Sequence, residues 1–236
     1  MNEPGVADNY RKVYNEGREV LVRTNGIRPF VDYADDVRRR VMVALLPDMA
    51  SELLLTEEVL TPISNIADQC GLGLCLAGRD FPIHRTVGQA VVEENVYRPT
   101  CIKLDQDGDF YRIVTALQWF RINVLDDTLF LGRSGDNAPY ESNLMIGATE
   151  IPPIVEMAHV AIRLCYSRFP GVQPNMVRDF FHSTLARISR LPDKRRHLDR
   201  WREKIQKMAA KMRPIEFAFD RVYAGPMLPF LTGQKQ

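Results

Sequence analysis

The chain has 236 residues, of which 45% are hydrophobic and 26% are charged, so it is long enough to bury one substantial core. Its 31 lysines and arginines nearly balance its 30 acidic residues, and net charge therefore gives no overall attraction to nucleic acid or to anionic membranes. No apolar run is long enough to span a bilayer and the first residues hold no apolar signal core, so we expect a cytoplasmic protein with no membrane association.

The first part of the sequence predicts an arm that leads into a single domain. Residues 1–37 are polar, charged and only weakly periodic, and we expect them to form an N-terminal arm before one bilobed domain over residues 38–236. The apolar run "VMVALLP" predicts a strand that ends at Pro47. Asp48 or Ser51 can cap the helix that follows, and glycines then frame a second short strand, "LCLA".

The middle of the chain, "CIKLDQDGDFYRIVTALQWFRINVL", is rich in β-branched and aromatic residues. This composition predicts strands, with a hairpin turn at Asp107-Gly108. The aspartates around that turn do not match a calcium-binding loop, because the twelfth position counted from Asp105 is Ala116 instead of a glutamate.

The last third predicts mainly helix and strand in alternation. Apolar residues recur at helical spacing from Pro153 to Cys165, and "RFPG" ends that helix. A strand follows, then the basic helix Lys194–Lys211, and then a last strand, "IEFAFDRV". Strands thus occur in both halves of the domain.

Two of the four histidines stand in the same pattern of His, any residue, Thr and an apolar residue. The first copy is "HRTV" at His84–Val87, and the second is "HSTL" at His182–Leu185. Because side chains alternate along a strand, the His and Thr of each copy share a face with a small residue two positions further on. These two sets are His84, Thr86 and Gly88, and His182, Thr184 and Ala186. A small residue leaves room for a ligand, so we expect the two copies to line one groove.

The residue types of the paired motifs suit chemistry at a phosphate. Two histidines that face each other across a phosphate can act as general base and general acid near neutral pH. Threonine hydroxyls can donate hydrogen bonds to the non-bridging oxygens and stabilise the charge that develops there. These groups cover each role, so we expect no metal and no cofactor.

With these paired motifs the sequence resembles the two-histidine (2H) phosphoesterase superfamily, which includes RNA 2′,3′-cyclic phosphodiesterases and 2′-5′ RNA ligase-like proteins. Two copies of His-x-Thr/Ser-apolar define that superfamily, and both are present here. The resemblance also covers the order of elements from about Arg38 to Val222. It implies a bilobed α+β fold, in which two antiparallel sheets form a central cleft and helices lie on the outside.

The resemblance also implies roles for the motif residues. His84 and His182 would be the catalytic acid/base pair, and Thr86 and Thr184 would bind the phosphate of the substrate. Members of the superfamily act on RNA ends, cyclic nucleotides, 2′-5′ oligonucleotides and cyclic phosphates derived from ADP-ribose, so the resemblance leaves the substrate open.

Other residues are weaker candidates for contacts with substrate. Tyr223, just past the last predicted strand, can stack on a base or simply pack at the rim. The helix Lys194–Lys211 can follow an RNA backbone, although a solvated face is the simpler interpretation. Arg85 and Arg187 flank the motifs, but strand alternation turns Arg85 away from His84.

We therefore expect a metal-independent phosphodiesterase that hydrolyses 2′,3′-cyclic phosphates or 2′-5′ linked nucleotides, with RNA ends or small cyclic nucleotides as substrates. The alternatives are a nucleotide- or RNA-binding module that uses the same groove without turnover, and a ligase-like reverse reaction. His159 and His197 fall in predicted helices and are assigned no role. The sequence does not indicate an oligomeric state.

Overall fold

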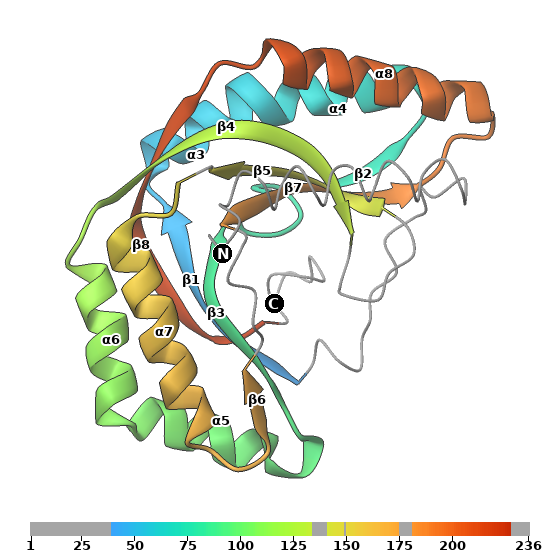
Figure 1. Cartoon of the computed structure of the whole chain (residues 1–236). Coiled ribbons are helices and arrows are strands. Elements are labelled where there is room, and N and C mark those ends of the chain that lie inside the picture. Colours follow the sequence, from blue (N-terminus) through green and yellow to red (C-terminus); the bar gives the residue numbers. More distant parts are fainter. Residues whose placement is uncertain (1–38, 134–140, 149, 175–180, 228–236) are drawn as a thin grey trace, which may run out of the picture.

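The computed structural model describes residues 39–133, 141–148, 150–174 and 181–227 (Figure 1). The arm predicted over residues 1–37 lies outside these ranges. Within them, eight strands pair into one antiparallel sheet in the order β2-β7-β5-β4-β8-β1-β3-β6. The strands are β1 (Arg40–Pro47), β2 (Gly73–Leu76), β3 (Arg85–Val92), β4 (Ile122–Arg133), β5 (Glu141–Ala148), β6 (Val172–Pro174), β7 (His182–Arg190) and β8 (Ile215–Pro226).

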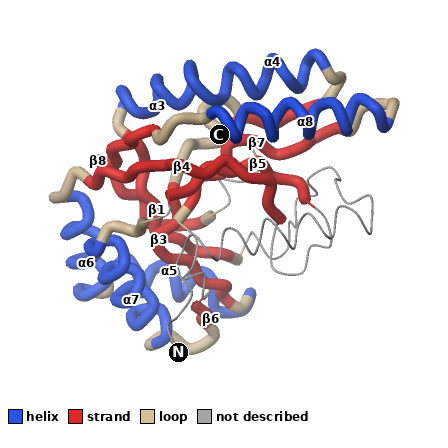
Figure 2. Tube along the Cα trace, turned by 45° about the horizontal axis from the view of Figure 1, so that its top comes forward, coloured by secondary structure: helices blue, strands red, loops and turns tan. Residues whose placement is uncertain are grey.

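Helices pack on the outer side of this curved sheet (Figure 2). They are α3 (Met49–Leu55), α4 (Thr61–Gln69), α5 (Tyr97–Gln106), α6 (Gly108–Gln118), α7 (Pro153–Ser167) and α8 (Arg195–Lys211), with a π-helical turn η1 (Thr56–Leu60) and a 3-10 turn η2 (Glu94–Val96). In Figure 1, α4 and α8 lie side by side over one half of the sheet, and α6 and α7 lie side by side along the other half. The predicted α+β class with two lobes and outer helices is confirmed.

Strand β8 joins the two lobes into one sheet. Residues Ile215–Phe219 of β8 pair with β4, and residues Phe219–Pro226 pair with β1. The two sheets expected from the sequence are therefore halves of a single hydrogen-bonded sheet.

The side chains of β1 point alternately to the two faces of the sheet. Val41, Val43 and Leu45 belong to the main apolar core beneath the helices, and we call this side the outer face. Met42 and Ala44 point to the opposite side, the inner face, where they form a small separate cluster. Both faces of β1 are buried, which explains its continuous apolar sequence.

The predicted start of the first helix is confirmed in detail. Asp48 is the N-cap of α3, and its carboxylate accepts a hydrogen bond from the backbone N–H of Ser51 at 2.7 Å. The Ser51 hydroxyl in turn accepts a hydrogen bond from the backbone N–H of Ala218 at 2.9 Å, which attaches α3 to β8. The helices predicted after Pro153 and over Lys194–Lys211 are also present, as α7 and α8.

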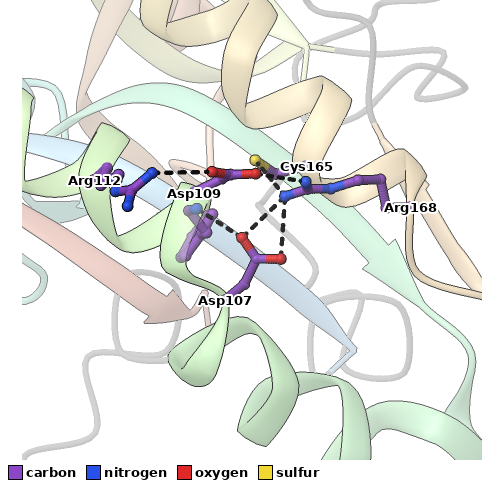
Figure 3. A network of polar contacts seen from close by, with 6 residues as sticks. Asp107, Asp109, Arg112, Cys165 and Arg168 are labelled. Carbon is purple, nitrogen blue, oxygen red and sulfur yellow. Dashed lines mark hydrogen bonds and ion pairs between the residues drawn. The ribbon is translucent and has the colours of Figure 1, made fainter.

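The hairpin predicted at Asp107-Gly108 and the strands predicted on either side of it are wrong, because this dipeptide joins the helices α5 and α6. Asp107 is the N-cap of α6 and accepts a hydrogen bond from the backbone N–H of Phe110 at 2.8 Å. Figure 3 shows that Arg168, at the end of α7, binds both Asp107 and Asp109. The same Asp-Gly pair that suits a tight turn also suits a capped helix start, and packing of α6 against α7 selects the helix.

In the described part of the chain, no helix has the length and apolar composition that crossing a membrane requires.

Candidate active site

The two motifs lie at the starts of strands β3 and β7. His84 directly precedes β3, and His182 is the first residue of β7. In the sheet order these strands are separated by β1, β8, β4 and β5. The curvature of the sheet nevertheless brings their starts into contact, because Arg85 Nε donates a hydrogen bond to Ser183 Oγ at 3.2 Å. The second residues of the two motifs, Arg85 and Ser183, are therefore in contact.

A β-bulge follows the threonine of each motif. Thr86 pairs with Ala44 and Gly88 with Val43, so Val87 is an extra residue in β3. The second motif repeats this arrangement, with Thr184 opposite Met145 and Ala186 opposite Leu144. Leu185 is thus the extra residue of β7, and the strand alternation shifts after both threonines.

The bulges correct the expectation that Gly88 and Ala186 leave space for a ligand. Gly88 shares the outer face with its partner Val43, and a Cβ atom there would lie 2.7 Å from Cγ2 of Ile162 on α7. Ala186 belongs to the main core on the same side. The small residues therefore permit close packing beneath the motifs and do not line the inner face.

Other side chains take the inner-face positions after the two threonines. Gln89 pairs with Met42, and Arg187 pairs with Asn143, which places both on the same side as the threonines. The sequence did not point to Gln89 or Asn143. The bulges that place Gln89 and Arg187, the partner of Asn143, on the inner face have no sequence pattern. Arg187, left as a flanking candidate, is now an inner-face residue.

Each threonine begins a short row of side chains across the inner face. Thr86 of β3, Ala44 of β1 and Tyr223 of β8 occupy paired positions. The corresponding row in the other lobe consists of Thr184 of β7, Met145 of β5 and Phe130 of β4. Both rows end in an aromatic ring, two strands from the threonine, or roughly 10 Å at the usual strand spacing.

Tyr223 lies within β8, instead of just past the last strand as predicted. Its hydroxyl donates a hydrogen bond to the carbonyl oxygen of Pro226 at 2.7 Å. Gly225 makes room for that hydroxyl, since a Cβ atom there would lie 2.9 Å from it. The ring is thus held at the inner face beside Ala44.

His84 is buried, and its ring orientation is set by the backbone. Nδ1 lies 2.9 Å from the carbonyl oxygen of Pro82, which can only accept, so in the neutral ring Nδ1 carries the proton and Nε2 is the basic nitrogen. Burial lowers the pKa of His84 to about 4, and the positive charge of Arg187 acts in the same direction. The hydrogen bond to Pro82 partly opposes this shift by stabilising the protonated ring.

His182 is half-buried and packs against the aromatic residue of its own lobe. Its ring meets Phe130 edge-on, with ring centroids 6.1 Å apart. Burial lowers the pKa of His182 to about 4, and the charges of Arg85 and His84 lower it further. Each lobe thus contributes one histidine that is neutral at pH 7. Protonation of His84 would make protonation of His182 less favourable.

Arg187 is buried with its guanidinium over an aromatic ring. The guanidinium carbon lies 4.0 Å from the centroid of Phe81, at a distance typical of a cation–π contact. The arginine therefore supplies positive charge beside His84. Asn143, its neighbour across the strands, is also buried, and its Oδ1 atom makes no hydrogen bond in the described structure.

The two remaining histidines lie away from the inner face. His159 Nδ1 on α7 is 2.7 Å from the carbonyl oxygen of Val87, the bulged residue of β3, so this ring supports the bulge. His197 is in the first turn of α8, on the outer layer of helices. The basic helix itself packs through Trp201 and Ile205, so it covers the outer face.

No family model matches this chain, and no curated protein matches it. Among solved structures, the chain is similar to that of Usb1 from Kluyveromyces marxianus, with a TM-score of 0.45 and 14% sequence identity. The match covers 80% of this chain and 98% of the Usb1 chain. The chemistry of the site therefore rests on its own residues.

Proposed function

We propose that the protein is a metal-independent phosphodiesterase that hydrolyses 2′,3′-cyclic phosphates or 2′-5′ linkages of nucleotides, with RNA ends as substrates. One observation carries the proposal. Two His-x-Thr motifs lie on strands that are distant in the sheet, yet the Arg85–Ser183 contact joins them, and both threonines share the inner face. Such a meeting of two motifs supports a single site for one phosphate.

In the proposed reaction, one histidine removes a proton from water and the other protonates the departing ribose oxygen. The attacking oxygen forms a bond to phosphorus as the bond to the leaving oxygen breaks, in line with it. Thr86 and Thr184 donate hydrogen bonds to the non-bridging oxygens. The Pro82 carbonyl supports the protonated form of His84 whichever of the two roles this histidine has.

The low pKa values of the two histidines imply that the substrate affects their protonation. With a pKa of about 4, each histidine is neutral at pH 7 in the free protein, whereas a general acid must carry a proton. A phosphodiester is anionic, and an anion between the rings favours an imidazolium. We therefore infer that the bound phosphate raises the pKa of the histidine that acts as the acid.

Tyr223 and Phe130 stand at the ends of the two threonine rows, where a nucleobase can stack on an aromatic face. We propose Tyr223 as the base-stacking residue, because its ring is held at the inner face and is half-buried, while Phe130 is buried against His182.

The test is a panel of 2′,3′-cyclic nucleotides, RNA with a 2′,3′-cyclic phosphate end, and 2′-5′ dinucleotides, with identification of products. His84→Ala and His182→Ala should each lower kcat by at least about 100-fold, the lower range for loss of a general acid or base. His197→Ala, a histidine on the outer layer, is the matched control and should retain full activity. Wild-type turnover by either motif variant on every accepted substrate would overturn the mechanism.

A nucleotide-binding module without turnover is the second candidate. The neutral state of both histidines in the free protein favours it, because neutral rings can hydrogen-bond a nucleotide without transferring protons. Tight binding of a cyclic nucleotide, with no product after hours, would support this candidate and contradict the hydrolase.

A further inference from the structure

We propose that Arg85 is a positioning residue, which joins the two motif strands behind the site and sets the separation of His84 and His182. The inference rests on the proposed function. Arg85 occupies the variable position of the first motif and follows His84 directly. As alternation predicts, its side chain lies on the outer face, where its partner Leu45 is part of the main core.

The Arg85 guanidinium binds both neighbours of His182. Nε donates to Ser183 Oγ at 3.2 Å, and Nη1 donates to the carbonyl oxygen of Phe181 at 3.2 Å. Nη2 forms an ion pair with the carboxylate of Asp126 on β4. One side chain beside the first histidine therefore holds the residues on either side of the second.

The sheet alone sets the distance between His84 and His182 only indirectly. No strand-to-strand hydrogen bonding links β3 and β7 in the described residues, and the path between them through the sheet crosses four other strands. Small changes of twist at each pair would add up along that path. Arg85 provides a direct connection, and reactions that depend on placement lose rate steeply when reacting groups shift.

The surroundings of Arg85 are specific for an arginine. The side chain is fully buried, and its guanidinium carbon lies 4.9 Å from the ring centroid of Phe181 and 5.3 Å from that of Phe219. A planar fork with three separated donors fits this set of partners, whereas a lysine ammonium does not. Replacement of a buried ion pair by apolar residues is often neutral or stabilising, so stability is a weak reason for this pair.

Arg85 also acts on His182 by its charge. The nearby guanidinium contributes to the low pKa of His182, while Arg187 contributes to that of His84. Arg85 thus lowers the pKa of His182, and Arg187 lowers the pKa of His84. A readout of each histidine therefore distinguishes the effect of the Arg85 charge from a general loosening of the fold.

Two variants separate geometry from charge. Arg85→Lys retains the charge and loses the fork, so kcat should fall about 10- to 100-fold, KM should change less than about threefold, and the pKa of His182 should stay low. Arg85→Met combined with Asp126→Asn removes both charges, so the pKa of His182 should rise, while burial, the larger cause, still keeps it below its ordinary value of 6.5, and the pKa of His84 should change little. NMR titration of the ring protons measures both pKa values without turnover.

Arg112→Lys is the matched control, because Arg112 lies on α6 with its side chain 83% exposed, and this variant should behave as the wild type. If Arg85→Lys does not fold, Ser183→Ala makes the comparison, since it removes one acceptor of the same guanidinium. A folded Arg85→Lys with kcat within twofold of the wild type, or an unchanged His182 pKa in the uncharged double variant, would overturn the inference. If the wild type turns over no substrate, the proposed function fails, while the titration still tests the Arg85 contact with His182.

Discussion

At the residue scale, the two motif histidines lie where their neutral form is favoured. Both pKa values are about 4, and burial is the main cause for each. Positive charges from Arg187 and Arg85 add to it on the two sides of the site. In the proposed reaction, this arrangement disfavours protonation before the anionic substrate binds and so couples proton uptake to substrate binding.

The same shifts predict how stability depends on pH. Well above pH 6.5 both histidines are neutral in the native and the unfolded chain. As the pH falls from 6.5 toward 4, the unfolded chain binds protons that the native state does not, so the free energy of unfolding decreases. The loss amounts to at most about 1.4 kcal/mol per pH unit for each histidine, and it levels off below both pKa values.

Urea unfolding from pH 7 down to about pH 5 measures this loss of stability, because the histidines of the unfolded chain take up protons over that range. The wild type should lose stability over this range, and the double variant His84→Gln/His182→Gln should lose much less. Equal slopes for the two proteins would show that other groups cause the pH dependence.

At the element scale, the matching bulges of β3 and β7 arrange each motif. They keep His and Thr on one face and then turn Gly88 or Ala186 to the helices. The carbonyl of the first bulge is bound by His159 from α7, which also supplies Ile162 beneath Gly88. Helix α7 therefore supports the first motif from behind.

Gly88→Ala tests this packing. Its Cβ atom would lie 2.7 Å from Ile162 Cγ2, so we expect a loss of stability of about 1–3 kcal/mol, as for other overpacked cores. Ile162→Ala removes the clashing atom, and the double variant should be less destabilised than the sum of the two changes. Urea unfolding measures all three variants.

Gly108→Ala is the matched control, because apart from its chain neighbours and its own helix backbone nothing lies within 4 Å of the position of its Cβ, and this variant should unfold like the wild type. If Gly88→Ala raised KM without a loss of stability, Gly88 would instead leave space for substrate.

At the scale of the whole molecule, β4 and β8 make the two lobes one structural unit. Their pairing continues the sheet from one lobe to the other, and Arg85 adds a second connection through Asp126 and the start of β7. A single sheet with a shared core favours one cooperative transition.

Trp201 offers a reporter for this cooperativity. It is fully buried in α8, whereas Trp119 at the end of α6 is 82% exposed. In a Trp119→Phe variant, urea unfolding followed by Trp201 fluorescence and by far-UV circular dichroism should give one coincident midpoint. A two-step dichroism curve, with fluorescence following only one step, would show that the lobes unfold separately.

The sequence alone determined the features that depend on local patterns. It contained β1, the Asp48 cap, α7 and α8, and the alternation that turns Arg85 away from His84. It also contained the two motifs, whose residue types suggest a phosphate site. These features were predictable because periodicity and capping involve residues close together in the chain.

Only the tertiary structure decided how these parts meet. Asp107 caps a helix where the local composition favours a hairpin, because α6 packs against α7 and Arg168 binds the cap. The two bulges place Gln89 and Arg187, instead of Gly88, on the inner face. Register and packing are set by strands and helices distant in the sequence, so no local pattern shows them.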